Sequence, residues 1–166
     1  MIKIIKYAGQ AIVYGAIMVM LGYFATSPAY RHFPEGLARI TLTFSHGGKP
    51  KGGCHRRTSE EIAKLPPNMR RPFDCPRNRV PVYVQLQVDG NTVYEESLAP
   101  TGVQGDGPAR AYKGIRIAAG PHKIIARLRD SERTDGFDYE READVVLEPA
   151  QHFIIKFRAE AGGFIF

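Results

Sequence analysis

Two cysteines and two histidines are the residues of this chain most able to bind a metal or form a cross-link. Cys54 is followed directly by His55, while His46 and Cys75 lie on either side of that pair. Thiolate and imidazole ligands suit copper or zinc. However, the spacing of these four residues is not that of a zinc finger. The N-terminal segment described below predicts export, and a pair of thiols in an exported protein tends to oxidise. We therefore predict one disulfide, Cys54–Cys75, worth about 3 kcal/mol in the chain-entropy model, with a metal site on His46, Cys54, His55 and Cys75 as the alternative.

The positive charge of the chain is concentrated around these cysteines. Residues 49–79 carry nine basic and three acidic side chains, a net charge of +6, whereas residues 80–166 carry ten basic and thirteen acidic side chains. Such a patch attracts an acidic protein face, acidic lipid headgroups or a polyanion, and the alternative is a solvated loop without a partner. No stacking aromatics are interleaved with the charges, so we do not expect nucleic acid. The predicted partner-binding residues are Lys49, Lys51, Arg56, Arg57, Arg70, Arg71, Arg77 and Arg79.

The sequence offers little for catalysis. It lacks the motifs G-x-S-x-G, H-E-x-x-H and G-x-x-x-x-G-K. Asp130, Asp135 and Asp138 share one loop, but their spacing is not that of an EF-hand. We therefore expect neither an enzyme nor a cofactor.

The N-terminal segment has the pattern of a membrane-targeting helix. Lys3 and Lys6 precede residues 7–28, in which the only ionisable groups are tyrosine phenols. This run falls within the roughly 17–25 residues that span a bilayer and exceeds the roughly 7–15 of a signal-peptide core. We predict that residues 1–29 form an uncleaved anchor in the lipid bilayer, with a signal peptide cleaved after Ala29 as the alternative. The basic lead predicts a single-pass protein of the bacterial inner membrane with its C-terminal domain in the periplasm.

The elements that must position the cysteine-containing segment are mostly strands. After a tether at 30–36, residues 37–46 alternate between apolar and polar side chains, and six more alternating segments follow from residue 80 to residue 157, most of them separated by short turns. Seven strands at this spacing predict an all-β, antiparallel β-sandwich of immunoglobulin-like or transthyretin-like kind over residues 37–166. The predicted core residues are Leu86, Ile124, Leu128, Val145, Ile155 and Phe157.

The basic segment 47–79 interrupts this pattern as an insertion. Thr58-Ser59-Glu60-Glu61 matches a capping box, and Pro66-Pro67 ends any helix that begins there. We predict a helix of about two turns, fixed to the sandwich by Ile62 and Leu65. The C-terminal tail, which ends in apolar residues, is expected to dock.

One N-terminal helix followed by one exported sandwich is similar, at the level of architecture alone, to accessory subunits and assembly factors of bacterial respiratory complexes and to many other anchored adaptor proteins. Together with the charge of the insertion, this architecture predicts a membrane-anchored accessory or assembly protein that docks on a membrane complex through its basic insertion. The alternative is an exported sandwich that binds a carbohydrate, a lipid or a metal ion such as copper. Tyr83, Tyr94, Tyr112 and Tyr139 are the candidates for a sugar-binding platform.

Overall fold

The computed structural model of the protein describes residues 2–27 and 34–166. The chain divides into two compact units, Met1–Pro34 and Glu35–Phe166. The predicted cleavage site after Ala29 and the first part of the predicted tether lie outside the described residues.

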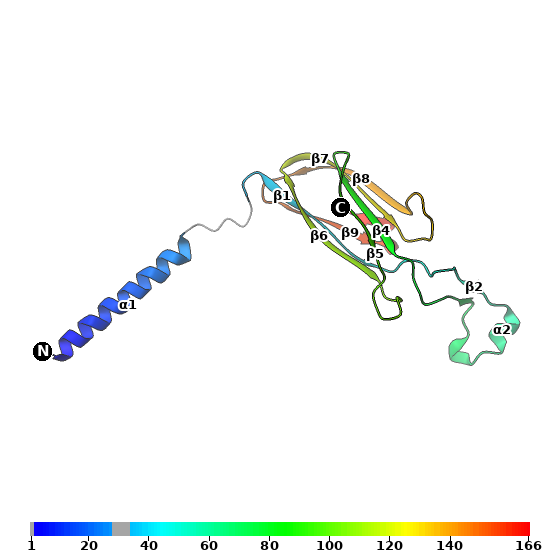
Figure 1. The fold of residues 1–166 in the computed structure, drawn as a ribbon, viewed down its shortest axis with the longest axis horizontal. Coiled ribbons are helices and arrows are strands. Elements are labelled where there is room, and N and C mark those ends of the chain that lie inside the picture. Colours follow the sequence, from blue (N-terminus) through cyan, green and yellow to red (C-terminus); the bar gives the residue numbers. More distant parts are fainter. Residues whose placement is uncertain (1, 28–33) are drawn as a thin grey trace. The chain divides into compact units, whose positions relative to one another are not determined.

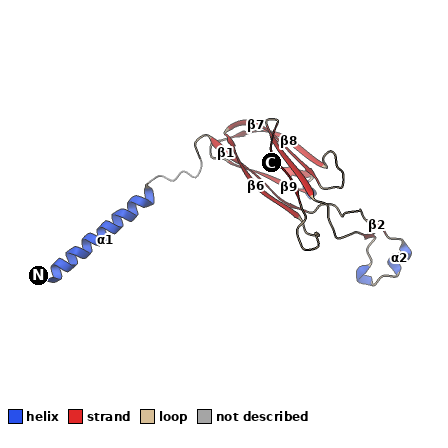
Figure 2. Ribbon diagram, viewed as in Figure 1, coloured by secondary structure: helices blue, strands red, loops and turns tan. Residues whose placement is uncertain are grey.

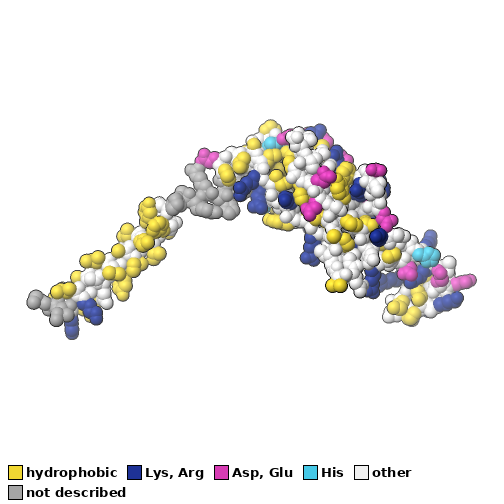
Figure 3. All heavy atoms as spheres, in the orientation of Figure 1, with side chains coloured by type: hydrophobic (Ala, Val, Ile, Leu, Met, Phe, Trp, Pro, Cys, Tyr) yellow, Lys and Arg dark blue, Asp and Glu magenta, His cyan; other side chains and the backbone are white. Residues whose placement is uncertain are grey.

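The first unit is a single helix, α1 (Ile2–Thr26), whose described side chains are all exposed within this unit. The Thr26 hydroxyl donates to the Gly22 carbonyl at 3.2 Å and closes its last turn. Figure 3 shows hydrophobic side chains along its length and Lys and Arg only near its start. By length and composition, the segment Lys3–Thr26 is able to cross a membrane.

The second unit is mostly β-structure and contains two four-stranded sheets (Figure 1). In the first sheet the strand order is β10-β9-β1-β6, and in the second it is β5-β4-β7-β8. The strands of the first sheet are β1 (Leu37–His46), β6 (Ala109–Ala118), β9 (His152–Arg158) and β10 (Gly163–Ile165). The strands of the second sheet are β4 (Val82–Val88), β5 (Asn91–Leu98), β7 (Gly120–Arg129) and β8 (Tyr139–Leu147).

Local sequence explains why these strands form where they do. Every second residue of β4 is buried, which matches its apolar–polar alternation. The hairpin from β4 to β5 turns at Asp89-Gly90, and both residues have positive φ, at 52° and 79°. Two positive φ values are what a two-residue type I′ hairpin requires, so the predicted turn is confirmed.

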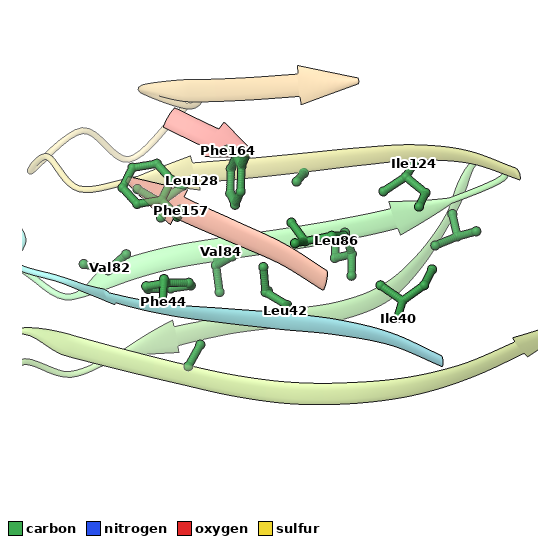
Figure 4. Packing of buried hydrophobic residues seen from close by; sticks show 14 of the residues in the cluster. Ile40, Leu42, Phe44, Val82, Val84, Leu86, Ile124, Leu128, Phe157 and Phe164 are labelled. Carbon is green, nitrogen blue, oxygen red and sulfur yellow. The ribbon is translucent and has the colours of Figure 1, made fainter. Parts of the chain in front are cut away.

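One hydrophobic core lies between the two sheets, and Figure 4 shows inward side chains of both sheets meeting there. Five of the six predicted core residues are buried, and Val145 packs half-buried at the margin. Each fully buried leucine or isoleucine contributes about 1.5–3 kcal/mol relative to an exposed one. The tail docks as predicted, because Phe164 in β10 is buried and the Phe164 carbonyl accepts from Arg141 at 2.8 Å.

The predicted count of seven strands is wrong, because residues 34–166, which the structure describes, contain ten. All seven predicted strands are present, and the additions are β10 and two strands of two residues each, β2 (His55–Arg56) and β3 (Phe73–Asp74). Elements of two or three residues are too short to show an alternating pattern. The first sheet is also not wholly antiparallel, because β9 runs parallel to β1. The chain crosses from β8 in the second sheet to β9 in the first, so β9 does not follow β1 through a hairpin.

The helix of the insertion is shorter than predicted and is not fixed to the sheets. It is α2 (Ser59–Ala63), followed by the short 3₁₀ helix η1 (Pro67–Met69), as Figure 2 shows. Pro66 and Pro67 stop α2, since proline has no N–H to donate. No residue of α2 is buried, and Ile62 and Leu65 are only half-buried. Their predicted packing on the sandwich is therefore not found.

Candidate functional site

The two cysteines are joined to each other, which confirms the predicted disulfide. They flank the small hairpin of β2 and β3, in which His55 pairs with Asp74 and Arg56 with Phe73. We call residues 54–75, which this bond closes, the disulfide loop. The presence of this disulfide bond indicates an oxidising compartment. The four residues of the alternative metal site are not brought together: His46, at the end of β1, bonds to Asp130 instead.

Local hydrogen bonds give the disulfide loop a definite shape. The Thr58 side chain accepts from the Glu61 N–H at 3.3 Å, and Glu61 Oε2 accepts from the Thr58 N–H at 2.7 Å, so the predicted capping box is present. The hydrogen bond from the Thr58 backbone lowers the pKa of Glu61. Across the hairpin, Arg57 Nη2 lies 3.0 Å from Asp74 Oδ2. These local bonds and the disulfide hold the loop, since none of its residues is buried.

The root of the insertion, residues 47–52 and 77–79, is bound tightly to the sheets through Asp130. Asp130, at the end of β7, is 3 % exposed, and its Oδ2 lies 2.7 Å from His46 Nε2. No hydrogen bond among the described residues reaches its Oδ1, whose nearest cation is Lys49 Nζ at 3.5 Å. The Asp130 carbonyl also accepts from the Lys49 N–H at 2.8 Å. Gly48 packs so closely that a Cβ there would lie 2.2 Å from the Val80 carbonyl oxygen.

A second carboxylate lies close to Asp130. Burial alone would raise the pKa of Asp138, but hydrogen bonds from the Ser131 hydroxyl and the Asp130 N–H, with Lys49 and Arg133 nearby, lower it overall. Lys49 Nζ lies 3.9 Å from Asp138 Oδ1. Lys49 is thus shared between two carboxylates, and its charge is used within the domain.

The predicted partner-binding cations fall into two groups. Some are occupied: Lys49 contacts Asp130, Arg57 contacts Asp74, and Arg79 donates to the Gly48 and Asp106 carbonyls at 2.9 and 3.1 Å. Arg70 donates to the Leu65 carbonyl at 3.1 Å. The others make no side-chain hydrogen bond or ion pair among the described residues: Lys51, Arg56, Arg71 and Arg77.

An open, partly apolar hollow lies on the disulfide loop beside these free cations. Its apolar lining comes from Leu65, Met69 and Phe73, and its cationic rim from Arg57, Arg71 and Arg77. Met69 and Phe73 are 58 % and 52 % exposed, although both are large hydrophobic residues. Aromatic residues, methionine and arginine are the types enriched at the centres of protein interfaces.

Sequence reasoning missed Met69 and Phe73 as candidates. The available signal was the presence of large apolar residues in a segment with no periodic pattern, between Pro67 and Pro76. Exposed apolar residues that lie together and are surrounded by polar ones mark interaction sites.

The tyrosines do not gather into a sugar-binding platform. The Tyr83 hydroxyl donates to Glu95, while the ring stacks on Phe137 on the outer face of the second sheet. Tyr139 packs against Phe157 at the margin of the core, and Tyr112 lies on β6 in the other sheet. Burial, with a hydrogen bond to Glu96, raises the pKa of Tyr94 to about 12.

No protein-family model, curated protein or solved structure matches this chain.

Proposed function

We propose that the protein is a membrane-anchored accessory or assembly factor whose insertion docks on an acidic face of a membrane protein complex, such as a respiratory complex. The observation that carries this proposal is the disulfide loop. It buries no side chain, yet it has a fixed shape and exposes Met69 and Phe73 beside unpaired cations. A segment that adds nothing to the core is most simply explained by an external contact.

The physical basis of docking combines apolar burial with charge attraction. Met69 and Phe73 would enter the partner as anchors, while Lys51, Arg56, Arg71 and Arg77 would face its carboxylates. The Cys54–Cys75 bond restricts the free loop, so less conformational entropy is lost on binding. Lys49 and Arg79 act at the root, where they orient the loop.

The location and the type of fold complete the proposal. We infer that α1 anchors the protein in a bacterial inner membrane, with an immunoglobulin-like or transthyretin-like sandwich in the periplasm. The support is an apolar helix able to cross a membrane, a disulfide, and two sheets that share one core. The intact mass of the protein from the membrane fraction tests the anchor, and a mass that begins at Tyr30 would overturn it.

Charge reversal of the full chain tests the docking surface. The insertion variant carries Lys51→Glu, Arg56→Glu, Arg71→Glu and Arg77→Glu, and a sheet variant carries Arg110→Glu, Arg116→Glu, Lys156→Glu and Arg158→Glu. Each variant reverses four positive charges, so the two variants differ only in where the reversed charges lie. We expect the insertion variant alone to lose its partner in mild-detergent purification, and high salt to weaken the wild-type complex.

A photoreactive phenylalanine analogue identifies the contact directly. Placed at Phe73, it should cross-link to an acidic segment of one membrane protein. Placed at Val103, a fully exposed loop residue, it should not give this product. If the insertion variant keeps its partner and the Phe73 probe gives no specific product, the insertion is only a solvated loop.

A further inference from the structure

The first sheet carries a second, separate basic surface that the function of the insertion does not use. Its four strands contain six basic residues and no aspartate or glutamate. The second sheet has five acidic and four basic residues, and its cations are largely paired: Lys123 with Glu142 at 2.6 Å and Arg127 with Glu140 at 3.1 Å. Figure 3 shows Lys and Arg side chains along the side of the domain that β6 forms.

Strand register places five of these cations on one face, the outer face of the first sheet. Outward positions alternate with the buried residues Ile40, Leu42 and Ile155, and paired residues share a face. We call this surface the cation face, and its basic residues are Arg39, Arg110, Arg116, Lys156 and Arg158. None of their side chains makes a hydrogen bond or ion pair within the part of the chain that the structure describes.

The arrangement costs stability within the domain itself. Arg39 and Arg116 lie directly opposite each other in the β1–β6 register, and like charges in that position are destabilising. Arg39 also lies across Gly114, where a Cβ would be 2.4 Å from its Nη2. Protection of an exposed sheet edge would explain cations on β6 but not those on β1 and β9, which are interior strands of this sheet.

Apolar side chains lie among the cations. Tyr112 is 71 % exposed and Ile154 is 40 % exposed, both at outward positions. Cations mixed with a tyrosine and an isoleucine are the composition of a surface that rests in a lipid headgroup layer, where cations meet phosphates and rings meet the acyl boundary.

Chain connectivity limits the distance between this face and any bilayer that holds α1. Ten residues, 27–36, separate the end of α1 from the start of β1, and covalent geometry limits their span to at most about 36 Å. Arg39 lies two residues after Leu37, where β1 begins, and Arg116 is its neighbour across the ladder. The insertion leaves the opposite end of β1, about 30 Å further along at roughly 3.3 Å per residue.

We propose that the cation face binds the anionic phospholipid headgroups of the membrane in which α1 is anchored, and so lays the outer face of the first sheet along the bilayer surface. This proposal rests on the membrane anchoring in the proposed function, but not on the docking of the insertion. Each cation at an anionic membrane surface is worth about fivefold in the binding equilibrium.

The chain contains no tryptophan, which makes a single-site fluorescence test possible. Tyr112→Trp puts the sole tryptophan on the cation face, and Val146→Trp, at an exposed position on β8, puts it on the outer face of the other sheet. The full chain is reconstituted in phosphatidylcholine vesicles with and without phosphatidylglycerol, each doped with spin-labelled lipid. For the Tyr112→Trp protein we expect quenching with phosphatidylglycerol and little without it. For the Val146→Trp protein we expect little quenching in either kind of vesicle.

Charge variants and salt, applied to the Tyr112→Trp protein, then identify the cause. Arg116→Gln with Lys156→Gln should weaken the face-bound state about 25-fold, from about fivefold for each cation. Raising salt from about 0.1 M to about 1 M shortens the Debye length from about 10 Å to about 3 Å and should release the tryptophan from the headgroup layer. The insertion variant should leave the quenching unchanged, which separates this proposal from the docking of the insertion.

Two results would overturn the inference. If the tryptophan of the Tyr112→Trp protein is quenched no more than that of the Val146→Trp protein with phosphatidylglycerol present, the cation face does not meet the membrane. If the Arg116→Gln, Lys156→Gln protein instead loses a co-purifying acidic protein, the face is a protein-binding surface. Circular dichroism of each variant checks that the β-structure is retained.

Discussion

Removal of the Asp130 carboxylate should lower the stability of the domain strongly, although Asp130 lies just after the end of a strand. Asp130→Ala leaves His46, whose side chain is 16 % exposed, without its partner at 2.7 Å. Leaving a buried hydrogen-bonding group without its partner costs about 1–3 kcal/mol. We expect the upper end, about 3 kcal/mol, because the same carboxylate also lies 3.5 Å from Lys49 Nζ.

Thermal unfolding of the full chain in detergent measures this effect. At about 2.1 cal/mol/K per residue, a domain of this length loses roughly 3–4 °C of melting temperature per kcal/mol, so we expect a fall of about 10 °C. The melting temperature of Asp130→Asn should fall less, since the amide oxygen of the asparagine still accepts from His46. Limited trypsin digestion should also cut faster after Lys51, because the root is loosened.

Asp135→Ala is the matched control, since Asp135 is an exposed carboxylate in the loop that follows Asp130. If Asp130→Ala and Asp135→Ala melt within about 2 °C of each other, the buried carboxylate does not hold the root, and the reasoning fails.

Three other perturbations have defined outcomes. Gly48→Ala should destabilise the domain by about 1–3 kcal/mol in denaturant titration, because its Cβ would meet the Val80 carbonyl oxygen, and a neutral result would mean that the root shifts freely. Unreduced protein should resist thiol alkylation, since the two cysteines are joined to each other. Cys54→Ser with Cys75→Ser should weaken partner binding, because the unlinked loop loses more conformational entropy when it docks. His122 has a raised pKa because its Nδ1 bonds to a carboxylate, so its contribution to stability is complete below the pKa of an unfolded histidine and is lost as pH rises through the folded value. Melting temperatures from about pH 6 to about pH 9 should therefore fall less in His122→Gln than in the wild type, and parallel curves would refute this assignment.

Local sequence by itself determined most of the elements of this protein. Alternation predicted all seven long strands, and Asp89-Gly90 predicted the hairpin between β4 and β5, because both signals depend only on neighbouring residues. The capping box at Thr58 and Glu61 was predicted for the same reason. The disulfide followed from the number of cysteines and from the export that the N-terminal segment predicts.

Only the tertiary structure decided which charges are free to act. Asp130 lies far from His46 in sequence, yet its side chain contacts both His46 and Lys49, so Lys49 is paired within the domain. The cation face could not be predicted from the sequence either, because Arg39 and Arg116 become neighbours only through the pairing of β1 with β6. Pairing between distant strands sets these contacts, and the charge of a segment alone cannot specify which charges remain unpaired.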